Sequence, residues 1–155
     1  EAMTLPENQD KHLVAVSNGG DEYGAAEEYI YDKQLEGRVF FLKDLPWYEL
    51  PIIYHMSQGL VYPSLYEGFG LPILEALRCG KPVITSNLSS MPEVGGDACI
   101  FIDPTNVEEI SAAINFIYYN LELAAEIKEK AMHQIQKFNP QKMTDKMMDV
   151  YKGLA

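Results

Sequence analysis

The stretch YPSLYEGFGLPILEALRCGKPVI, residues 62–84, decides how this chain folds. Its first residues close an apolar run that reads as a buried strand, and its second half has the apolar spacing of a helix that begins near Leu71. Between them lies a loose turn, Gly68-Phe69-Gly70, whose glycines allow backbone conformations that other residues avoid. A strand that passes through a glycine turn into a helix is typical of α/β folds.

The rest of the chain repeats this alternation of short apolar runs with helical patterns. The runs are apolar on both faces, which is typical of parallel strands covered on both sides by helices. We therefore predict a Rossmann-like α/β domain with a parallel sheet and helices on both of its faces. Helical patterns occupy residues 21–35 and 47–58, and Pro51 is expected to distort the second. The predicted strands are residues 12–17, 38–42, 60–64, 82–86 and 99–103.

The last third of the chain shows only helical patterns, which predicts an all-helical tail. Asn106 opens a helix over residues 107–119 with a capping box, and Asn139-Pro140 opens the final helix. Another helix lies between them at about residues 121–138. Each has an apolar face that we expect to be part of the core. In the final helix this face consists of Met143, Met147, Tyr151 and Leu154.

Size and charge narrow the possible functions. At 155 residues the chain is long enough to bury a core, and we assign residues 1–155 to a single domain. Its 23 acidic and 12 basic residues give a net charge of −11, which argues against binding to nucleic acid or to anionic lipid. Cys79 and Cys99 lie in apolar contexts and are expected to be buried free thiols, as in a reducing compartment. Without an apolar run of about 20 residues or a signal peptide, the domain is expected to face the cytosol.

Two glutamates flank the glycine turn. Glu67 follows a strand, and ligands of parallel sheets bind at the carboxyl ends of the strands. The helix that starts near Leu71 points its free N–H groups and positive dipole end at the same place, which suits a phosphate. Glu75 lies one turn inside that helix, too deep to cap it. Glu28 and Glu36 have the same spacing without a glycine turn, so the spacing alone does not indicate a site. The informative feature is the strand, glycine turn and helix start around Glu67 and Glu75. Two carboxylates beside a phosphate cradle fit a nucleotide-sugar, which carries hydroxyl-rich sugars at both ends.

These residues also resemble a known family. The segments EGFGLPILEA and GKPVITSNLSSMPEVGGDACIFIDP are similar to the C-terminal domain of the group 1, or family 4, glycosyltransferases, which are retaining enzymes of the GT-B architecture. The resemblance runs from HLVAVSNGGDE through RVFFL and YPSLYEGFG to KFNPQKMTDKMMDVYKGL. Several motifs in the right order and at the right intervals are a specific signal, whereas likeness of fold alone would not indicate a function.

The resemblance implies roles for individual residues. The family's pair of glutamates falls on Glu67, beside the reacting face of the donor sugar, and on Glu75, at the ribose hydroxyls. Glu67 is thus the candidate catalytic residue, and transfer with retention is implied. No metal or other cofactor is expected, because the nucleotide-diphosphate sugar is the substrate. The other implied donor-binding residues are Gly68, Phe69, Gly70 and Leu71 around the distal phosphate, Leu42 and Lys43 at the nucleobase, and Gly19 in the same cleft.

The resemblance further implies what other segments of an enzyme would supply. Family members hold the diphosphate with an Arg and a Lys just after the first strand of this domain, and we expect that strand, the start of the first helix and the N-terminal acceptor domain to lie outside this chain. An acceptor sugar, lipid or other molecule would bind to that N-terminal domain. The full-length enzyme would be cytoplasmic, either free or peripheral at the inner face of the membrane. The 155-residue chain alone is expected to bind donor weakly and to be inactive.

Two other classes of function fit parts of the pattern. A GT-B epimerase would convert a nucleotide-sugar without an acceptor, and a phosphorylase-like enzyme would need a lysine that binds pyridoxal phosphate, which no segment resembles. A non-catalytic nucleotide-binding module would be expected to have an acidic cluster and a lysine at its strand ends. The strand ends of this chain carry glycine, serine and glutamate instead.

Overall fold

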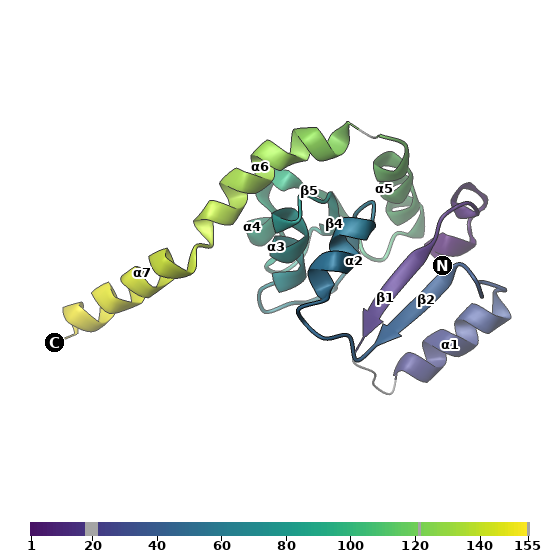
Figure 1. Ribbon diagram of the computed structural model, residues 1–155, viewed down its shortest axis with the longest axis horizontal. Helices are drawn as coiled ribbons and strands as arrows, with labels where there is room; N and C mark the ends of the chain where they lie inside the picture. Colours follow the sequence, from purple (N-terminus) through teal and green to yellow (C-terminus); the bar gives the residue numbers. More distant parts are fainter. Residues whose placement is uncertain (18–21, 121, 155) are drawn as a thin grey trace.

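The computed structural model describes residues 1–17, 22–120 and 122–154 (Figure 1). Strands alternate with helices until the last strand, and only helices follow it. The strands are β1 (Leu13–Ser17), β2 (Val39–Lys43), β3 (Leu60–Tyr62), β4 (Val83–Ser86) and β5 (Cys99–Ile102). The helices are α1 (Glu22–Asp32), α2 (Leu50–Met56), α3 (Leu71–Arg78), α4 (Met91–Gly95), α5 (Val107–Tyr119), α6 (Leu123–Lys137) and α7 (Pro140–Gly153). Short 3-10 turns are η1 (Ala2–Thr4), η2 (Pro6–Asn8) and η3 (Gly96–Ala98).

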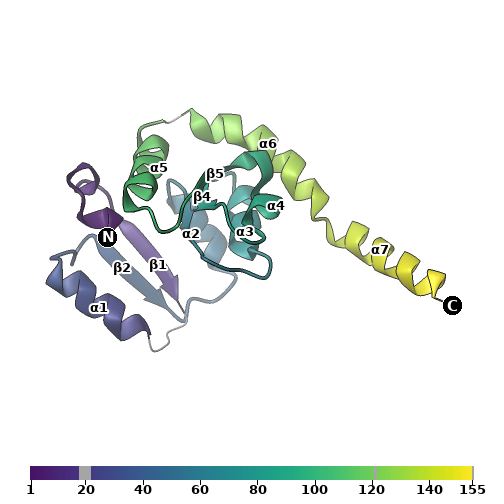
Figure 2. The same cartoon turned by 180° about the vertical axis from the view of Figure 1, so that it is seen from behind.

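All the described strands pair in parallel, as predicted. β1 pairs with β2, with Leu13 opposite Val39, and β4 lies between β3 and β5. Within the described residues no ladder joins the two groups, so the strands form a two-stranded and a three-stranded sheet where a single sheet was expected. Helices lie on both sides of the strands (Figures 1 and 2). The predicted Rossmann-like fold class with a helical C-terminal end is confirmed.

The hydrophobic core lies in the three-stranded half of the molecule. β4 is buried along its whole length, and α3 buries four of its eight residues between the sheet and α6. The first turn of α3 is therefore anchored to the most buried part of the fold. The core side chains are Ile73, Leu74, Ala76, Leu77, Val83, Ile84, Met91, Val94, Ala98, Ile102, Ala113, Ile117, Leu123, Ile127 and Ala131.

The two-stranded half is packed more loosely. Along β1, half-buried and exposed side chains alternate, and Val14 and Val16 are 46 and 41% exposed. Phe40 on β2 is also exposed. A groove of about 380 Å³ lies between this sheet and α1, with Leu13 and Ala15 in its lining. Parallel strands are stable when both of their faces are covered, and these strands meet that condition only in part.

A buried polar cluster connects the two halves. Asn8 of η2 is fully buried, and its Nδ2 donates to Oγ of Ser111 on α5 at 2.7 Å. Nδ2 of Asn115 donates to Oδ1 of Asn8 at 3.0 Å. Nearby, Nζ of the buried Lys11 lies 4.6 Å from the centroid of the Tyr118 ring. Because buried polar groups are costly to leave unpaired, this cluster ties the segment before β1 to α5.

Side-chain caps start two of the tail helices, as predicted. Oδ1 of Asn106 accepts a hydrogen bond from the N–H of Glu109 at 3.0 Å, and Oδ1 of Asn139 accepts from the N–H of Gln141 at 2.8 Å. Each bond satisfies an N–H group that the first helical turn leaves without an intrahelical partner. The carboxylate of Glu109 accepts from the N–H of Asp103, so the capping box is not closed reciprocally.

One helix is shorter in the structure than its apolar sequence pattern predicts. The helix expected over residues 47–58 is α2, which begins at Leu50. Pro51 lies in its first turn, where the fixed φ of proline suits a helix and its missing N–H has no partner to lose. The expectation that Pro51 distorts the helix is therefore wrong, because this proline helps to start it. Trp47 and Tyr48 precede the helix and are exposed.

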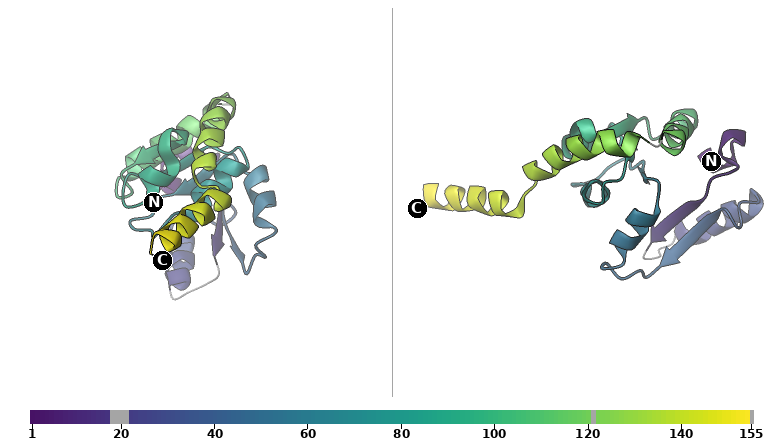
Figure 3. Two further views of the ribbon diagram at one scale, coloured as in Figure 1. Left: turned by 90° about the vertical axis from the view of Figure 1, so that its left-hand side faces the viewer. Right: turned by 45° about the horizontal axis from the view of Figure 1, so that its top comes forward.

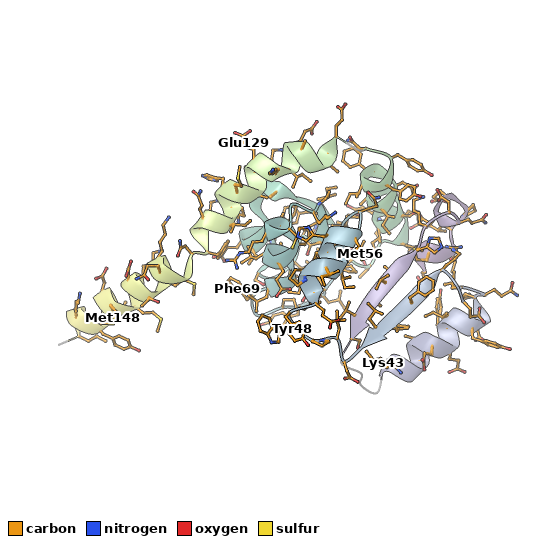
Figure 4. All side chains as sticks on the ribbon, in the orientation of Figure 1. Lys43, Tyr48, Met56, Phe69, Glu129 and Met148 are labelled. Carbon is orange, nitrogen blue, oxygen red and sulfur yellow. The ribbon has the colours of Figure 1, made fainter. Side chains whose placement is uncertain are left out.

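The final helix contradicts another prediction. α7 extends away from the rest of the molecule (Figures 1 and 3), and Met148 in Figure 4 marks its exposed position. Periodicity identifies an apolar face but does not supply a surface to cover it. None of the described helices, α7 included, is both long and apolar enough to cross a membrane. The side chains predicted to be core are instead 51 to 80% exposed: Met143, Met147, Tyr151 and Leu154.

The two cysteines are free thiols, as predicted, but both are half-buried. Burial raises the pKa of the Cys99 thiol to about 12. The pKa of the Cys79 thiol is also raised, first by burial and then by the negative charge of Glu75. Both side chains therefore stay protonated at neutral pH and behave as small apolar groups.

Candidate functional site

The carboxyl end of β3 opens into the glycine turn. Gly70 is the N-cap of α3 and has a φ of 96°, a left-handed conformation that only glycine adopts without strain. A Cβ at Gly70 would also lie 3.2 Å from Cδ1 of Ile73. Gly68 differs, because its φ is not left-handed and an added Cβ would meet no described atom within 4 Å. Gly70 therefore shapes the turn, whereas Gly68 leaves space beside it.

The start of α3 presents backbone donors at this turn. Within the described part of the chain, no acceptor is recorded for the N–H groups of Phe69, Gly70 and Leu71. Pro72 has no N–H, and the N–H of Ile73 donates to the carbonyl of Gly70 at 3.1 Å. A helix N-terminus carries a positive partial charge, and free N–H groups there bind anions. The predicted phosphate cradle depends on these N–H groups, and phosphate binding there stays a prediction.

Two hydroxyl groups hold Glu67. The hydroxyl of Tyr62 donates to Oε1 of Glu67 at 2.5 Å, and Oγ of Ser64 donates to the same oxygen at 2.9 Å. The pKa of Tyr62 is raised, first by burial and then by this hydrogen bond, so its hydroxyl remains a donor at neutral pH. The half-buried carboxylate is thus oriented by its own loop.

The end of β4 fixes the loop that carries Glu67. Thr85 and Ser86 are fully buried, and polar side chains in that position need partners. Oγ1 of Thr85 donates to the carbonyl of Tyr62 at 3.0 Å, and Oγ of Ser86 donates to the carbonyl of Ser64 at 2.6 Å. The first bond joins the last pair of the β3–β4 ladder, and the second continues the contact beyond it.

Two more serines hold the glycine turn itself. Oγ of Ser89 donates to the carbonyl of Glu67 at 2.8 Å, and Oγ of Ser90 donates to the same carbonyl at 3.1 Å. Oγ of Ser90 also lies 3.0 Å from the carbonyl of Phe69, so its single proton is shared between the two carbonyls. With these carbonyls bound from one side, the turn is restrained in the conformation that exposes its N–H groups.

Glu75 is held from another element. It lies half-buried on α3, and the hydroxyl of Tyr54 on α2 donates to its Oε2 at 3.0 Å. The pKa of Tyr54 is raised well above its ordinary value, first by burial and then by the charge of Glu75. The hydroxyl therefore stays a donor, and Glu75 is not the freely solvated residue of a surface helix.

The residues predicted at the nucleobase lie on the other sheet. Leu42 and Lys43 form the end of β2, in the two-stranded half, and the glutamate pair belongs to the three-stranded half. In Figure 4, Lys43, Tyr48 and Phe69 lie along the same margin of the molecule. The structure thus brings Glu67, the glycine turn and Glu75 together and leaves Leu42 and Lys43 at the end of a strand of the other sheet. Gly19 falls outside the described residues.

Sequence reasoning missed the side chains that hold the two glutamates. Tyr62 lies in an apolar strand and Tyr54 in an apolar helical pattern, so neither hydroxyl stands out from those of core tyrosines. A signal does exist for the hydroxyl groups around the turn. The run TSNLSS, residues 85–90, places four hydroxyl residues at the end of a strand, and such residues bond to nearby backbone.

Comparison with known proteins shows one family. The family model described as "Glycosyl transferases group 1" matches residues 1–134. The chain is 40% identical over 119 residues to O-antigen chain mannosyltransferase B of Escherichia coli, covering 77% of this chain and 31% of that protein. It is 32% identical over 106 residues to O-antigen chain mannosyltransferase RfbU of Salmonella typhimurium, covering 68% of this chain and 30% of that protein. The chain thus spans about a third of the length of these curated relatives.

Solved structures have the same fold. Sucrose-phosphate synthase from Thermosynechococcus elongatus matches with a TM-score of 0.87 and 25% identity, covering 99% of this chain and 40% of that chain. Anabaena Alr3699/HepE in complex with UDP and glucose matches with a TM-score of 0.81 and 23% identity, covering 92% of this chain and 40% of that chain. In both proteins the matching part is less than half of the polypeptide.

Proposed function

The chain belongs to the group 1 glycosyl transferases, and on this premise we propose that it is the donor-binding part of an enzyme that transfers a hexose from a nucleotide-sugar to an acceptor. One observation supports this most directly. The glycine turn at the N-terminus of α3 lies between two glutamates whose carboxylates are already oriented by hydrogen bonds, at the carboxyl end of a parallel strand. An anion cradle flanked by two carboxylates matches the chemistry of a sugar diphosphate.

Each part of the site then has a role in binding the donor. The N–H groups of Phe69, Gly70 and Leu71 hold the distal phosphate, and Glu75 accepts hydrogen bonds from the ribose hydroxyls. Negative charge increases on the distal phosphate as the glycosidic bond breaks, so donors aimed at it stabilise the transition state more than the ground state. Gly68 leaves room for the donor beside the turn.

Glu67 lies beside the reacting sugar in this proposal. It positions the sugar and supports the positive charge that develops near the anomeric carbon, without acting as a general base. The acceptor attacks on the leaving group's own face, a phosphate oxygen takes its proton, and configuration is retained. In this proposal no metal is needed, because the helix dipole and the backbone N–H groups of the glycine turn bind the phosphate charge.

Base, sugar and acceptor are assigned to separate regions. Leu42 and Lys43 are the proposed contacts to the nucleobase. Two relatives are named mannosyltransferases, so a mannosyl donor is the first to test. The acceptor binds to a segment beyond this chain, and we propose that the enzyme works on the cytoplasmic side of the membrane, either free or peripheral to it.

Hydrogen exchange tests this function in the full-length polypeptide that contains the chain. UDP-, GDP- and ADP-sugars are added in turn, and amide exchange is followed by mass spectrometry. One nucleotide class should slow exchange around residues 68–71, and the variant Glu75→Gln should weaken its binding about tenfold, as expected for a lost hydrogen bond to a charged group. Glu36→Gln is the matched control, because Glu36 is exposed and has the same spacing from Glu28. Protection absent from residues 68–71 at millimolar ligand contradicts the proposal.

A further inference from the structure

Resting on the proposed function, we propose that Tyr62 and Ser64 are positioning residues for Glu67, and that Tyr54 is a positioning residue for Glu75. In each glutamate one carboxylate oxygen is held by internal hydroxyl groups. The other oxygen is thereby directed to the hydroxyl groups of the donor: Oε2 of Glu67 to the sugar and Oε1 of Glu75 to the ribose.

The geometry at Glu67 supports the first half of the proposal. Both recorded donors, Tyr62 and Ser64, converge on Oε1, so rotation of the carboxylate would break two hydrogen bonds at once. The donors are themselves fixed, because Thr85 and Ser86 bind the carbonyls of the same two residues. The buried end of β4 thus holds Tyr62 and Ser64, and these two residues in turn orient Glu67.

Glu75 is oriented by a different construction. Tyr54 reaches its Oε2 from α2, and Lys81 binds the end of α2. Nζ of Lys81 donates to the carbonyls of His55 and Ser57 at 2.9 and 2.8 Å, at the C-terminal end of α2. The backbone N–H of Lys81 bonds to α3 at Ala76. Tyr54 and Glu75 are therefore held on two helices that one lysine connects.

The second pair of glutamates with this spacing provides a contrast. Glu28 and Glu36 are both exposed, and no side-chain hydrogen bond is recorded for either within the described residues. A glutamate loses side-chain entropy when it is ordered, so a carboxylate that is already held binds a ligand at lower entropic cost. Of the two glutamate pairs with this spacing, only the pair that flanks the glycine turn accepts side-chain hydrogen bonds within the described residues, which links the hydroxyl groups to the site and not to the spacing.

Tyrosine-to-phenylalanine variants test the proposal, because they remove one oxygen and keep the ring. In the full-length polypeptide, Tyr54→Phe should raise the donor KM about tenfold with little change in kcat, since Glu75 binds a part of the donor that does not react. Tyr62→Phe should lower kcat about tenfold and Ser64→Ala severalfold, and each should have a smaller effect on KM. Tyr31→Phe, at an exposed site on α1, is the matched control and should change neither constant.

A double-mutant cycle separates positioning from general support of the fold. Tyr54→Phe should have no further effect on KM when Glu75 is already Gln, and Tyr62→Phe should have none on kcat when Glu67 is already Gln. The proposal is overturned if the effects of the two substitutions are fully additive. It is also overturned if each variant lowers kcat and raises KM by the same factor, in step with a lower melting temperature. If Tyr62→Phe does not fold, Ser64→Ala carries the test at Glu67.

The same data distinguish this proposal from the function on which it rests. If Glu67→Gln and Glu75→Gln impair turnover and the hydroxyl variants do not, positioning is wrong and the donor site stands. If neither glutamate variant changes turnover or donor binding, the donor site itself is wrong.

Discussion

The three-stranded and two-stranded halves differ in how their parallel strands are covered. β4 is buried along its whole length between helices, whereas β1 and β2 leave Val14, Val16 and Phe40 exposed. The glutamates and the glycine turn belong to the well-packed half, and the proposed nucleobase contacts at Leu42 and Lys43 belong to the other.

This difference parallels the two proposed roles within the site, which are orientation of the glutamates and contact with the base. The two glutamates lie next to the most buried element, because side chains at the end of β4 hold the loop that carries Glu67. The proposed contacts to the base lie on β2, which pairs with β1, and the segment before β1 is joined to α5 through polar bonds of Asn8.

A core truncation should separate the halves most clearly. Leu77 is 2% exposed and packs within the core, so Leu77→Ala should lower the free energy of unfolding by about 2–5 kcal/mol. Val16 is 41% exposed, so Val16→Ala should cost about 1 kcal/mol or less. Urea titrations followed by circular dichroism measure both. Similar losses for the two variants would mean that the two-stranded half is packed as well as the core.

The connection between the halves should break at Asn8. Asn8→Ala removes a fully buried amide and leaves Ser111 and Asn115 without that partner, which should cost about 1–3 kcal/mol. Hydrogen exchange should show faster opening of β1 and β2 than of β4. Gln58→Ala serves as the control, because that amide is exposed. Uniform acceleration in both halves would show that they open as one unit.

The glycine turn should show the smallest effect. Gly70→Ala forces alanine into a left-handed conformation beside Ile73 and should lower stability by about 1 kcal/mol. Gly68→Ala introduces neither strain nor a close contact and should leave stability unchanged or slightly higher. Thermal unfolding of the two variants side by side provides the measurement. Equal destabilisation would contradict the separate roles given to the two glycines.

Several features of the site and of the tail helices could be predicted from sequence because they depend on local geometry. The glycine turn, the start of α3 and the side-chain caps at Asn106 and Asn139 each involve residues within a few positions of one another. The contact between Tyr54 and Glu75 spans 21 residues and depends on how α2 packs against α3. No local pattern encodes such a contact, which explains why Tyr54 was missed. Tyr62 lies only five residues from Glu67 and was missed for another reason, because its apolar strand makes it resemble a core tyrosine.

The sequence by itself determined the order of strands and helices, the parallel character of the strands and the place of the glutamate pair, because apolar periodicity, glycine and proline act over short distances. Only the tertiary structure decided which apolar faces are covered. It divided the described strands into two sheets, left the apolar face of α7 exposed and directed Tyr54 and Tyr62 to the two carboxylates. Burial depends on which surfaces meet, and that is a property of the packed chain and not of any single segment.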